Sequence, residues 1–161
     1  SMIDRARHMI KNAEKSVYLS IWLAEYNKLH ADLVAAEKRG VDIVIFSFSE
    51  IPVDVGTVFA YNLDSRRLKD VWSSKILLVV DHDSALLGGV EMLPTNKVAW
   101  TRNSAIVSIA LNYIILDLTL FGQRYMLDMN PVITGMLHGE ISNLDDLLSE
   151  DHKAIIHLKK N

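Results

Sequence analysis

The feature that most constrains the fold is the order of elements between residues 17 and 46. Residues 17–23 are rich in β-branched and aromatic side chains, which is typical of a strand. Residues 26–38 then carry apolar side chains at helical spacing, and Gly40 suits the left-handed cap that ends such a helix. Residues 41–46 form a second apolar strand. This order predicts a βαβ unit, and therefore a parallel pair of strands in a sheet.

The middle of the chain predicts that the sheet continues in a different way. Residues 53–61 and the two apolar runs on either side of Asp81-His82-Asp83 read as strands joined by short turns. Residues 97–100 add a further short strand. Because these connections leave no room for crossover helices, we expect a mixed sheet that is parallel first and antiparallel later.

A long helix is predicted for residues 105–122, which are nearly all apolar. Their composition raises the possibility of a membrane span, but Asp117 argues against it, since an aspartate near the centre of a span costs roughly 2.5–3.5 kcal/mol. We therefore expect no membrane contact and a helix buried against its own sheet and a partner subunit. Beyond Pro131 we expect further helix, starting near residues 142–146 and reaching the end of the chain.

Composition excludes several classes of function. The 161 residues form one expected domain, 1–161, with a net charge of −3 and no cysteine, which excludes disulfides, thiolate metal sites and cysteine-based catalysis. The densest basic group is Arg66, Arg67 and Lys69, too few for this domain to bind DNA by itself. Residues 3–15 carry too many charges for the apolar region of a secretory signal, so we expect a cytoplasmic location. The six histidines form no HxxxH or HxH pair, and we expect no metal and no cofactor.

The stretch Asp81-His82-Asp83 allows two interpretations from its residues alone. An apolar strand that ends in Asp-x-Asp is how phosphatases of the haloacid-dehalogenase group present a nucleophile and an acid/base beside magnesium. Here, however, Ser84 and Ala85 lead straight into another strand, and no later strand delivers the remaining residues of that site. The second interpretation is a turn, in which the carboxylates accept hydrogen bonds from backbone amides.

The same stretch resembles the catalytic strand of the phospholipase D superfamily, which reads His-x-Lys-x-x-x-x-Asp and is followed by Gly-Gly seven residues after the Asp. Asp81 is followed at that distance by Gly88-Gly89. The positions of the catalytic His and Lys fall on Ser74 and Ile76. An isoleucine cannot stabilise a phosphoryl charge, so the resemblance implies a fold whose chemistry has been lost.

Four short pieces together resemble the effector domain of TrmB-type transcriptional regulators: Ser20-Ile-Trp22, Lys38-Arg-Gly-Val41, Val79-Val-Asp81 and Ala99-Trp-Thr-Arg-Asn103. The resemblance covers roughly residues 3–129. It implies an α/β fold, a phospholipase D-like α-β-α sandwich with a mixed sheet and a long C-terminal helical part. It also implies a homodimer, a small-molecule effector such as a sugar, and DNA bound only through a separate N-terminal winged helix–turn–helix domain.

Two departures from that family bear on these expectations. Residues 1–161 contain no counterpart of the DNA-binding domain. The Ser-Met start looks like a cloning remnant, so we expect the natural protein to extend further toward its N-terminus. The β-rich C-terminal region that contributes sugar contacts in familiar members is also missing, which leaves the effector's identity open.

Candidate effector-binding residues lie at two junctions between strand and helix. Trp22 and Glu25 follow the first strand, where open α/β sheets bind ligands, and Trp100, Thr101 and Asn103 precede the long helix. Indole faces with a carboxylate and an amide would suit a carbohydrate. Each residue also has a structural alternative: the tryptophans as core residues, Asn103 or Thr101 as the helix N-cap, and Glu25 in the first turn of a helix.

These observations predict a catalytically inactive domain that senses an effector and dimerises within a TrmB-type regulator. The alternative is an enzyme, either a divergent phosphodiesterase or an aspartate-based phosphatase that uses Asp81 and Asp83.

Overall fold

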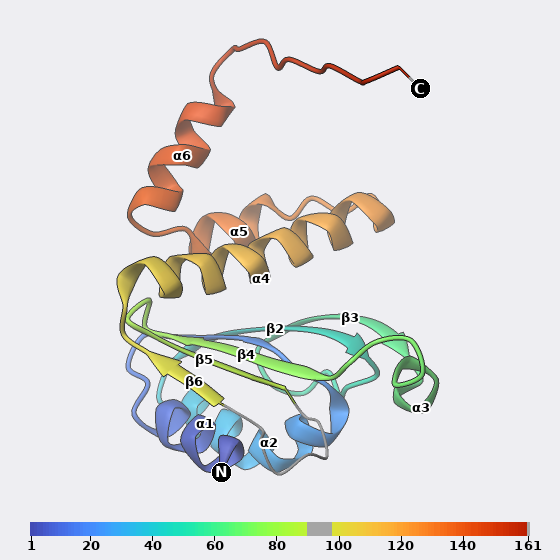
Figure 1. Ribbon diagram of the computed structural model, residues 1–161. Coiled ribbons are helices and arrows are strands. Elements are labelled where there is room, and N and C mark those ends of the chain that lie inside the picture. Colours follow the sequence, from blue (N-terminus) through green and yellow to red (C-terminus); the bar gives the residue numbers. More distant parts are fainter. Residues whose placement is uncertain (90–97, 161) are drawn as a thin grey trace.

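The chain folds into a six-stranded sheet with helices on both faces (Figure 1). The computed structural model describes residues 1–89 and 98–160. The strands are β1 Ser16–Ser20, β2 Asp42–Ser49, β3 Thr57–Leu63, β4 Lys75–Val80, β5 Ser84–Gly89 and β6 Val98–Thr101. The helices are α1 Met2–Lys11, α2 Leu23–Lys38, α3 Ser65–Leu68, α4 Ser104–Tyr125, α5 Asn130–Met136 and α6 Glu140–Ser149.

The sheet is mixed, as the sequence predicted, with strand order β3-β2-β1-β4-β5-β6. Strands β1, β2 and β3 are parallel to one another, whereas β4, β5 and β6 each run antiparallel to the strand before them in that order. The predicted βαβ unit is β1-α2-β2. Strand β1 ends earlier than expected, at Ser20, and the helix begins at Leu23. The first residue of the expected strand 97–100, Lys97, lies outside the described residues.

The connection between β2 and β3 is unusual because it joins two parallel strands through residues 50–56 alone. A parallel connection ordinarily needs a dozen or more residues. Here the loop lies tight against the sheet, with Ile51 and Val55 buried in the same core as α2. Gly56 has φ +63°, and a Cβ at this position would lie 2.5 Å from the carbonyl oxygen of Ile43. Only glycine allows the loop to pass this close to β2.

Side chains of α2 hold this loop in place. The carboxylate of Glu37 accepts a hydrogen bond from the amide of Gly56 at 2.9 Å. Asp54 accepts a hydrogen bond from the Tyr26 hydroxyl and lies 2.8 Å from Nε2 of His30. The loop is therefore pinned to the helix that precedes β2, which fixes the parallel order of the first three strands.

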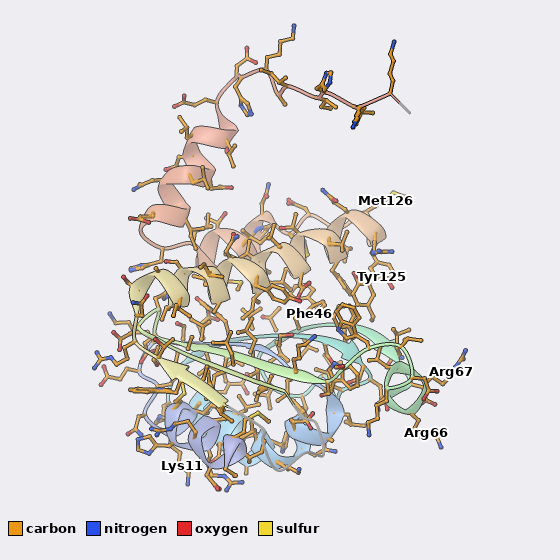
Figure 2. The ribbon with its side chains drawn as sticks, in the orientation of Figure 1. Lys11, Phe46, Arg66, Arg67, Tyr125 and Met126 are labelled. Atoms are coloured by element: carbon orange, nitrogen blue, oxygen red, sulfur yellow. The ribbon has the colours of Figure 1, made fainter. Side chains whose placement is uncertain are left out.

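Helices α1 and α2 cover one face of the sheet and α4 covers the other (Figure 1). Phe46, which is 1% exposed, lies between the sheet and α4 (Figure 2). The side chain of Asn103 accepts hydrogen bonds from the amides of Ala105 and Ile106, which confirms Asn103 as the N-cap of α4. Among the described residues, α4 is the one helix long and apolar enough to cross a membrane. One side of α4 nevertheless packs on the sheet.

The C-terminal part differs from the prediction. Helix α6 begins at Glu140 rather than near residue 142, and residues 150–160 are not helical, so the expectation of helix to the chain end was wrong. Helix α5 lies along α4, whereas α6 and the tail extend away from the body (Figure 1). Leu144, Leu147 and Leu148 of α6 are each more than half exposed. The apolar side chains of the tail, Ile155, Ile156 and Leu158, are 93%, 81% and 80% exposed, so no packing keeps this segment helical.

Candidate binding pocket

A pocket of about 590 Å³ opens between α4 and the sheet. It lies where β1 and β5 end and β4 begins, because β5 is parallel to β1 and β4 is antiparallel to both. Its walls come from elements that are far apart in the sequence: Ser20, Trp22, Phe48, Trp72, Ser73, Lys75, Ile76, Leu77, Leu87, Gly88, Gly89, Ala99, Ile109, Ala110, Tyr113 and Asp117. Most of these side chains are apolar or aromatic, which is typical of small-molecule sites.

Aromatic rings form much of the wall. Trp22 is 4% exposed, and Phe48 and Trp72 lie with their ring centroids 6.2 Å apart. The Lys75 ammonium lies 4.9 Å from the centroid of the Trp72 ring, so a cation already rests on one indole at the pocket. Tyr113 enters from α4 and is about half exposed. These rings provide flat apolar faces against which a ligand could stack.

Asp117 is the carboxylate of this pocket. Its Oδ2 atom is buried and has no hydrogen-bond partner among the described residues. Burial raises the pKa of Asp117 from 3.8 to about 6, because a low-dielectric surrounding disfavours the charged form. Burial, with the nearby Asp117 charge, also raises the pKa of Tyr113. The pocket thus contains an acid that no described cation neutralises.

Gly88 and Gly89 lie in different surroundings, and the absence of a side chain has a different consequence at each position. The flexible Met2 side chain of α1 packs against Gly88 in the space that a Cβ would occupy. A Cβ on Gly89 would meet no atom within 4 Å. Gly89 pairs with Lys75, which also lines the pocket, and so the missing side chain contributes to the open space.

The five predicted effector-binding residues do not form one site. Trp22 lines the pocket, whereas Glu25 is buried in the first turn of α2 and does not line it. Trp100 lies on the other face of the sheet, where the Arg5 guanidinium of α1 is 5.1 Å from the ring centroid. Thr101 and Asn103 lie at the opposite end of the sheet, since β6 runs antiparallel to β1. The structure therefore does not bring these five residues together in one pocket.

Thr101 and Asn103 instead have local structural roles. The Thr101 hydroxyl accepts a hydrogen bond from the Asn103 amide at 2.9 Å, and Asn103 caps α4. The pocket residues that sequence reasoning missed are Phe48, Trp72, Lys75, Tyr113 and Asp117. Asp117 carried a signal, because it is an isolated acid in an otherwise apolar helix, but nothing in the sequence indicated what it faces.

Ser74 and Ile76, which the sequence resemblance aligned with the catalytic His and Lys of phospholipase D, lie beside Lys75 at the start of β4. Ile76 is 1% exposed and belongs to the core under α1 and α2. The Ser74 hydroxyl is buried without a partner among the described residues. Neither side chain is a nucleophile activated by a neighbouring base or a cation for a phosphate.

Asp81 ties the start of β1 to the end of β4. Its carboxylate accepts hydrogen bonds from the amides of Glu14, Lys15 and Ser16, at 3.0, 2.7 and 2.9 Å. Burial acts to raise the pKa of Asp81, but these three amide bonds outweigh it and hold the pKa below its ordinary value of 3.8. Asp81 also has φ +54°. The turn interpretation of this residue is thereby confirmed.

Asp83 and His82 are also engaged in structural contacts. An oxygen of Asp83 lies 2.9 Å from the guanidinium of Arg102. Nε2 of His82 lies 3.0 Å from the carbonyl oxygen of Met136, and its ring lies 4.7 Å from that of His138. Within residues 1–89 and 98–160, no group of three histidine or acidic side chains is placed to hold a metal ion.

Comparison with known proteins places this geometry in a family. Residues 1–107 match the model described as transcriptional regulator TrmB, EBD N-terminal subdomain, where EBD denotes the effector-binding domain. The uncharacterized protein YrhO of Bacillus subtilis (strain 168) is 25% identical over 120 residues, which are 74% of this chain and 43% of YrhO. The chain therefore spans less than half the length of this curated relative.

Solved structures share the fold at low sequence identity. The archaeal chromatin protein TrmBL2, described as binding DNA in a novel mode, has a TM-score of 0.53 at 14% identity, over 70% of this chain and 46% of its own. NucT from Helicobacter pylori has a TM-score of 0.55 at 13% identity, over 73% of this chain and 87% of NucT. Nuc from Salmonella typhimurium, a phospholipase D family member, has a TM-score of 0.50 at 14% identity, over 72% of this chain and 86% of Nuc. The phospholipase D-like fold predicted from the sequence is confirmed.

Proposed function

The chain belongs to the TrmB family of transcriptional regulators, and on that premise we propose that it is the effector-sensing and dimerisation domain of such a regulator. The family match to an effector-binding subdomain supports a regulatory role. The chain spans only 43% of YrhO and 46% of TrmBL2, so a regulator of this kind has room for further domains. We propose that the whole protein binds DNA through a separate N-terminal winged helix–turn–helix domain.

The observation that carries the sensing role is the pocket between α4 and the sheet. Its volume of about 590 Å³ is in the range that holds small molecules. The resemblance to sugar-sensing regulators makes a sugar the effector expected from the family, and another small metabolite would fit the same role. Cytoplasmic metabolites are the natural effectors of such a regulator, and we place the protein in the cytoplasm.

The small number of clustered basic residues supports the assignment of DNA binding to a separate domain. Arg66 and Arg67 lie on α3 at one edge of the molecule (Figure 2), and Arg66 pairs with Asp64 at 3.2 Å. A phosphate-tracking surface needs several clustered cations, each releasing counterions from the nucleic acid. We therefore assign DNA contact to a different domain.

We propose that the domain is catalytically inactive. Nuc and NucT share its fold. By the sequence resemblance, however, Ser74 and Ile76 fall at the positions of the catalytic His and Lys. The alternative enzyme, a phosphodiesterase or an aspartate-based phosphatase, would need a free carboxylate at Asp81 or Asp83. Asp81 is held by three amides and is not available as a nucleophile, and Asp83 forms an ion pair with Arg102.

Dimerisation is supported by the outer face of α4. Ile109, Tyr113, Leu116 and Leu120 lie at spacings of three or four residues along this helix and are 69%, 49%, 57% and 45% exposed. Contiguous exposed apolar side chains of this kind mark interaction surfaces. We propose that this stripe, with the adjacent sheet edge at β6, forms the homodimer interface, and that α4 is an interface helix rather than a membrane span.

The pocket and the proposed interface share residues. Ile109 and Tyr113 belong to the α4 stripe and also line the pocket. A ligand that contacts these two side chains would therefore act directly on the packing between subunits. This gives a physical route from effector binding to the spacing of the attached DNA-binding domains.

The experiment is a thermal-shift screen of a metabolite library that includes maltose, trehalose and glucose. The Gly89→Trp variant places a large side chain in the open pocket, and Gly135→Trp, on α5 in open space, is its matched control. We expect at least one compound to raise the Tm of the wild type and of Gly135→Trp, but not of Gly89→Trp. If no compound does so, or if Asp81-dependent hydrolysis of bis(p-nitrophenyl) phosphate is found, the sensing proposal is wrong.

A further inference from the structure

The chemistry of the pocket is more specific than its volume. Its polar side chains are Ser20, Ser73, Lys75 and Asp117, together with the Tyr113 hydroxyl. The remaining lining is hydrocarbon, indole or benzene ring. A ligand that matches this lining has one strongly polar group and a large apolar body.

We propose that the pocket binds an amphiphilic organic amine, whose ammonium group pairs with Asp117 and whose apolar body packs against the aromatic walls. This deepens the proposed function, on which it rests, by naming the chemical class of the effector.

Asp117 supplies the first argument. Its Oδ2 atom is buried without a described partner, and the other charged group that lines the pocket is Lys75, from β4. Asp117 takes part in no ion pair with a basic group among residues 1–89 and 98–160. A buried carboxylate without a cation is unfavourable, and a ligand ammonium at hydrogen-bond distance would supply the missing charge.

The aromatic walls supply the second argument. Trp22, Phe48, Trp72 and Tyr113 present π-faces, which attract alkylammonium groups as well as apolar groups. The Lys75 side chain already shows this contact, since its ammonium lies 4.9 Å from the centre of the Trp72 ring. An aliphatic amine in the pocket could therefore contact the aromatic rings in the way that the Lys75 ammonium does. It could also pair with the Asp117 carboxylate.

A sugar or an anion fits the same surface less well. A sugar brings many hydroxyl groups, and those that face hydrocarbon would lose hydrogen bonds to water without replacement. Among the described residues that line the pocket, the one cation for an anion is Lys75, which is exposed to solvent, and exposed ion pairs contribute little to binding. An anion would also lie beside the Asp117 carboxylate. The charge arrangement therefore favours an amine.

The test compares two probes of equal size, 4-phenylbutylamine and 4-phenylbutanol, by isothermal titration calorimetry at pH 8. We expect the amine to bind the wild type at least about tenfold more tightly than the alcohol, the ratio typical of gaining one charge-assisted hydrogen bond. In Asp117→Asn this preference should disappear while the alcohol binds as before. Asp146→Asn, which removes the same charge from the exposed surface of α6, should keep the full preference.

The outcomes separate the ligand class from the sensing role. Equal binding of both probes, or a preference that survives in Asp117→Asn, overturns the amine assignment. Maltose binding that Gly89→Trp abolishes, without any amine preference, overturns the amine assignment and leaves the effector pocket intact. If neither probe nor any library compound binds, both proposals fail. The Tm of each variant shows that lost binding is not lost folding.

Discussion

Removing the charge of Asp117 is expected to stabilise the protein in a strongly pH-dependent way. An asparagine side chain has nearly the shape of the protonated aspartic acid and carries no charge at any pH. Burial raises the pKa of Asp117 from 3.8 to about 6 in the folded protein, whereas the unfolded chain keeps the ordinary value. Between these two pKa values the folded state binds more protons than the unfolded state, so stability falls as pH rises.

The magnitude follows from the two pKa values. At 1.36 kcal/mol per pKa unit, ionising Asp117 costs the folded state about 3 kcal/mol at pH 8, where both states are ionised. At pH 4 the cost is about 0.6 kcal/mol, because the folded state is then almost fully protonated while the unfolded state is only about 60% ionised. Tyr61 and Tyr113, whose pKa values burial raises, stay neutral over this range and do not obscure the effect.

The assay is urea unfolding of the wild type and Asp117→Asn at pH 4, 6 and 8. The variant should gain stability progressively with pH, up to about 3 kcal/mol at pH 8. Asp146→Asn on α6 should show no such trend. A gain for Asp117→Asn that is the same at all three pH values, or a loss at pH 8, would refute the claim that Asp117 is buried without a cation.

Further predictions concern the fold and the interface. Gly56→Ala should cost at least about 2 kcal/mol, since its methyl group would meet the β2 backbone, whereas Gly40→Ala, with positive φ but open space, should cost about 1 kcal/mol in urea unfolding. Asp81→Asn should cost about 1–3 kcal/mol at pH 7, and this loss should shrink as pH falls through the lowered pKa of Asp81. In sedimentation equilibrium, Leu116→Asp should convert the dimer to monomer, and Val53→Asp, at a more exposed position outside α4, should not.

The first half of the fold could be predicted because its signals are local. The helix between β1 and β2 has its periodicity, its basic end and Gly40 within one stretch of sequence. The parallel pairing of β2 with β3 could not be predicted in the same way. It depends on Gly56 passing beside Ile43 and on Asp54 reaching Tyr26, contacts that only the assembled core brings together.

The pocket was only partly predictable for a related reason. Trp22 was identified because it follows β1, the edge at which open sheets bind ligands. Trp100 was assigned to the same site because its strand-to-helix junction looked equivalent. The direction of β6 puts that junction at the other end of the sheet, and pairing directions between distant strands leave no mark in a single sequence. Asp117 reaches the pocket only because α4 packs across β1, β2, β4 and β5.

The stretch around Asp81 shows what the family resemblance added. Its residues alone allowed a nucleophile or a turn, and the three amide bonds to its carboxylate confirm the turn. The spacing to Gly88-Gly89 predicted the phospholipase D-like fold, and the structure explains both glycines, one by contact with α1 and one by the open pocket.

The central claim, that a ligand in the pocket changes the arrangement of two subunits, is tested most directly by a distance measurement between them. The chain has no cysteine, so Lys11→Cys on the outer side of α1 (Figure 2) gives each subunit a single spin-label site. Electron–electron double resonance should give one intersubunit distance that shifts when 4-phenylbutylamine, or a compound from the library screen, saturates the pocket. The Gly89→Trp variant should keep the unliganded distance. No intersubunit distance, or one unchanged at saturation in the wild type, would contradict the account.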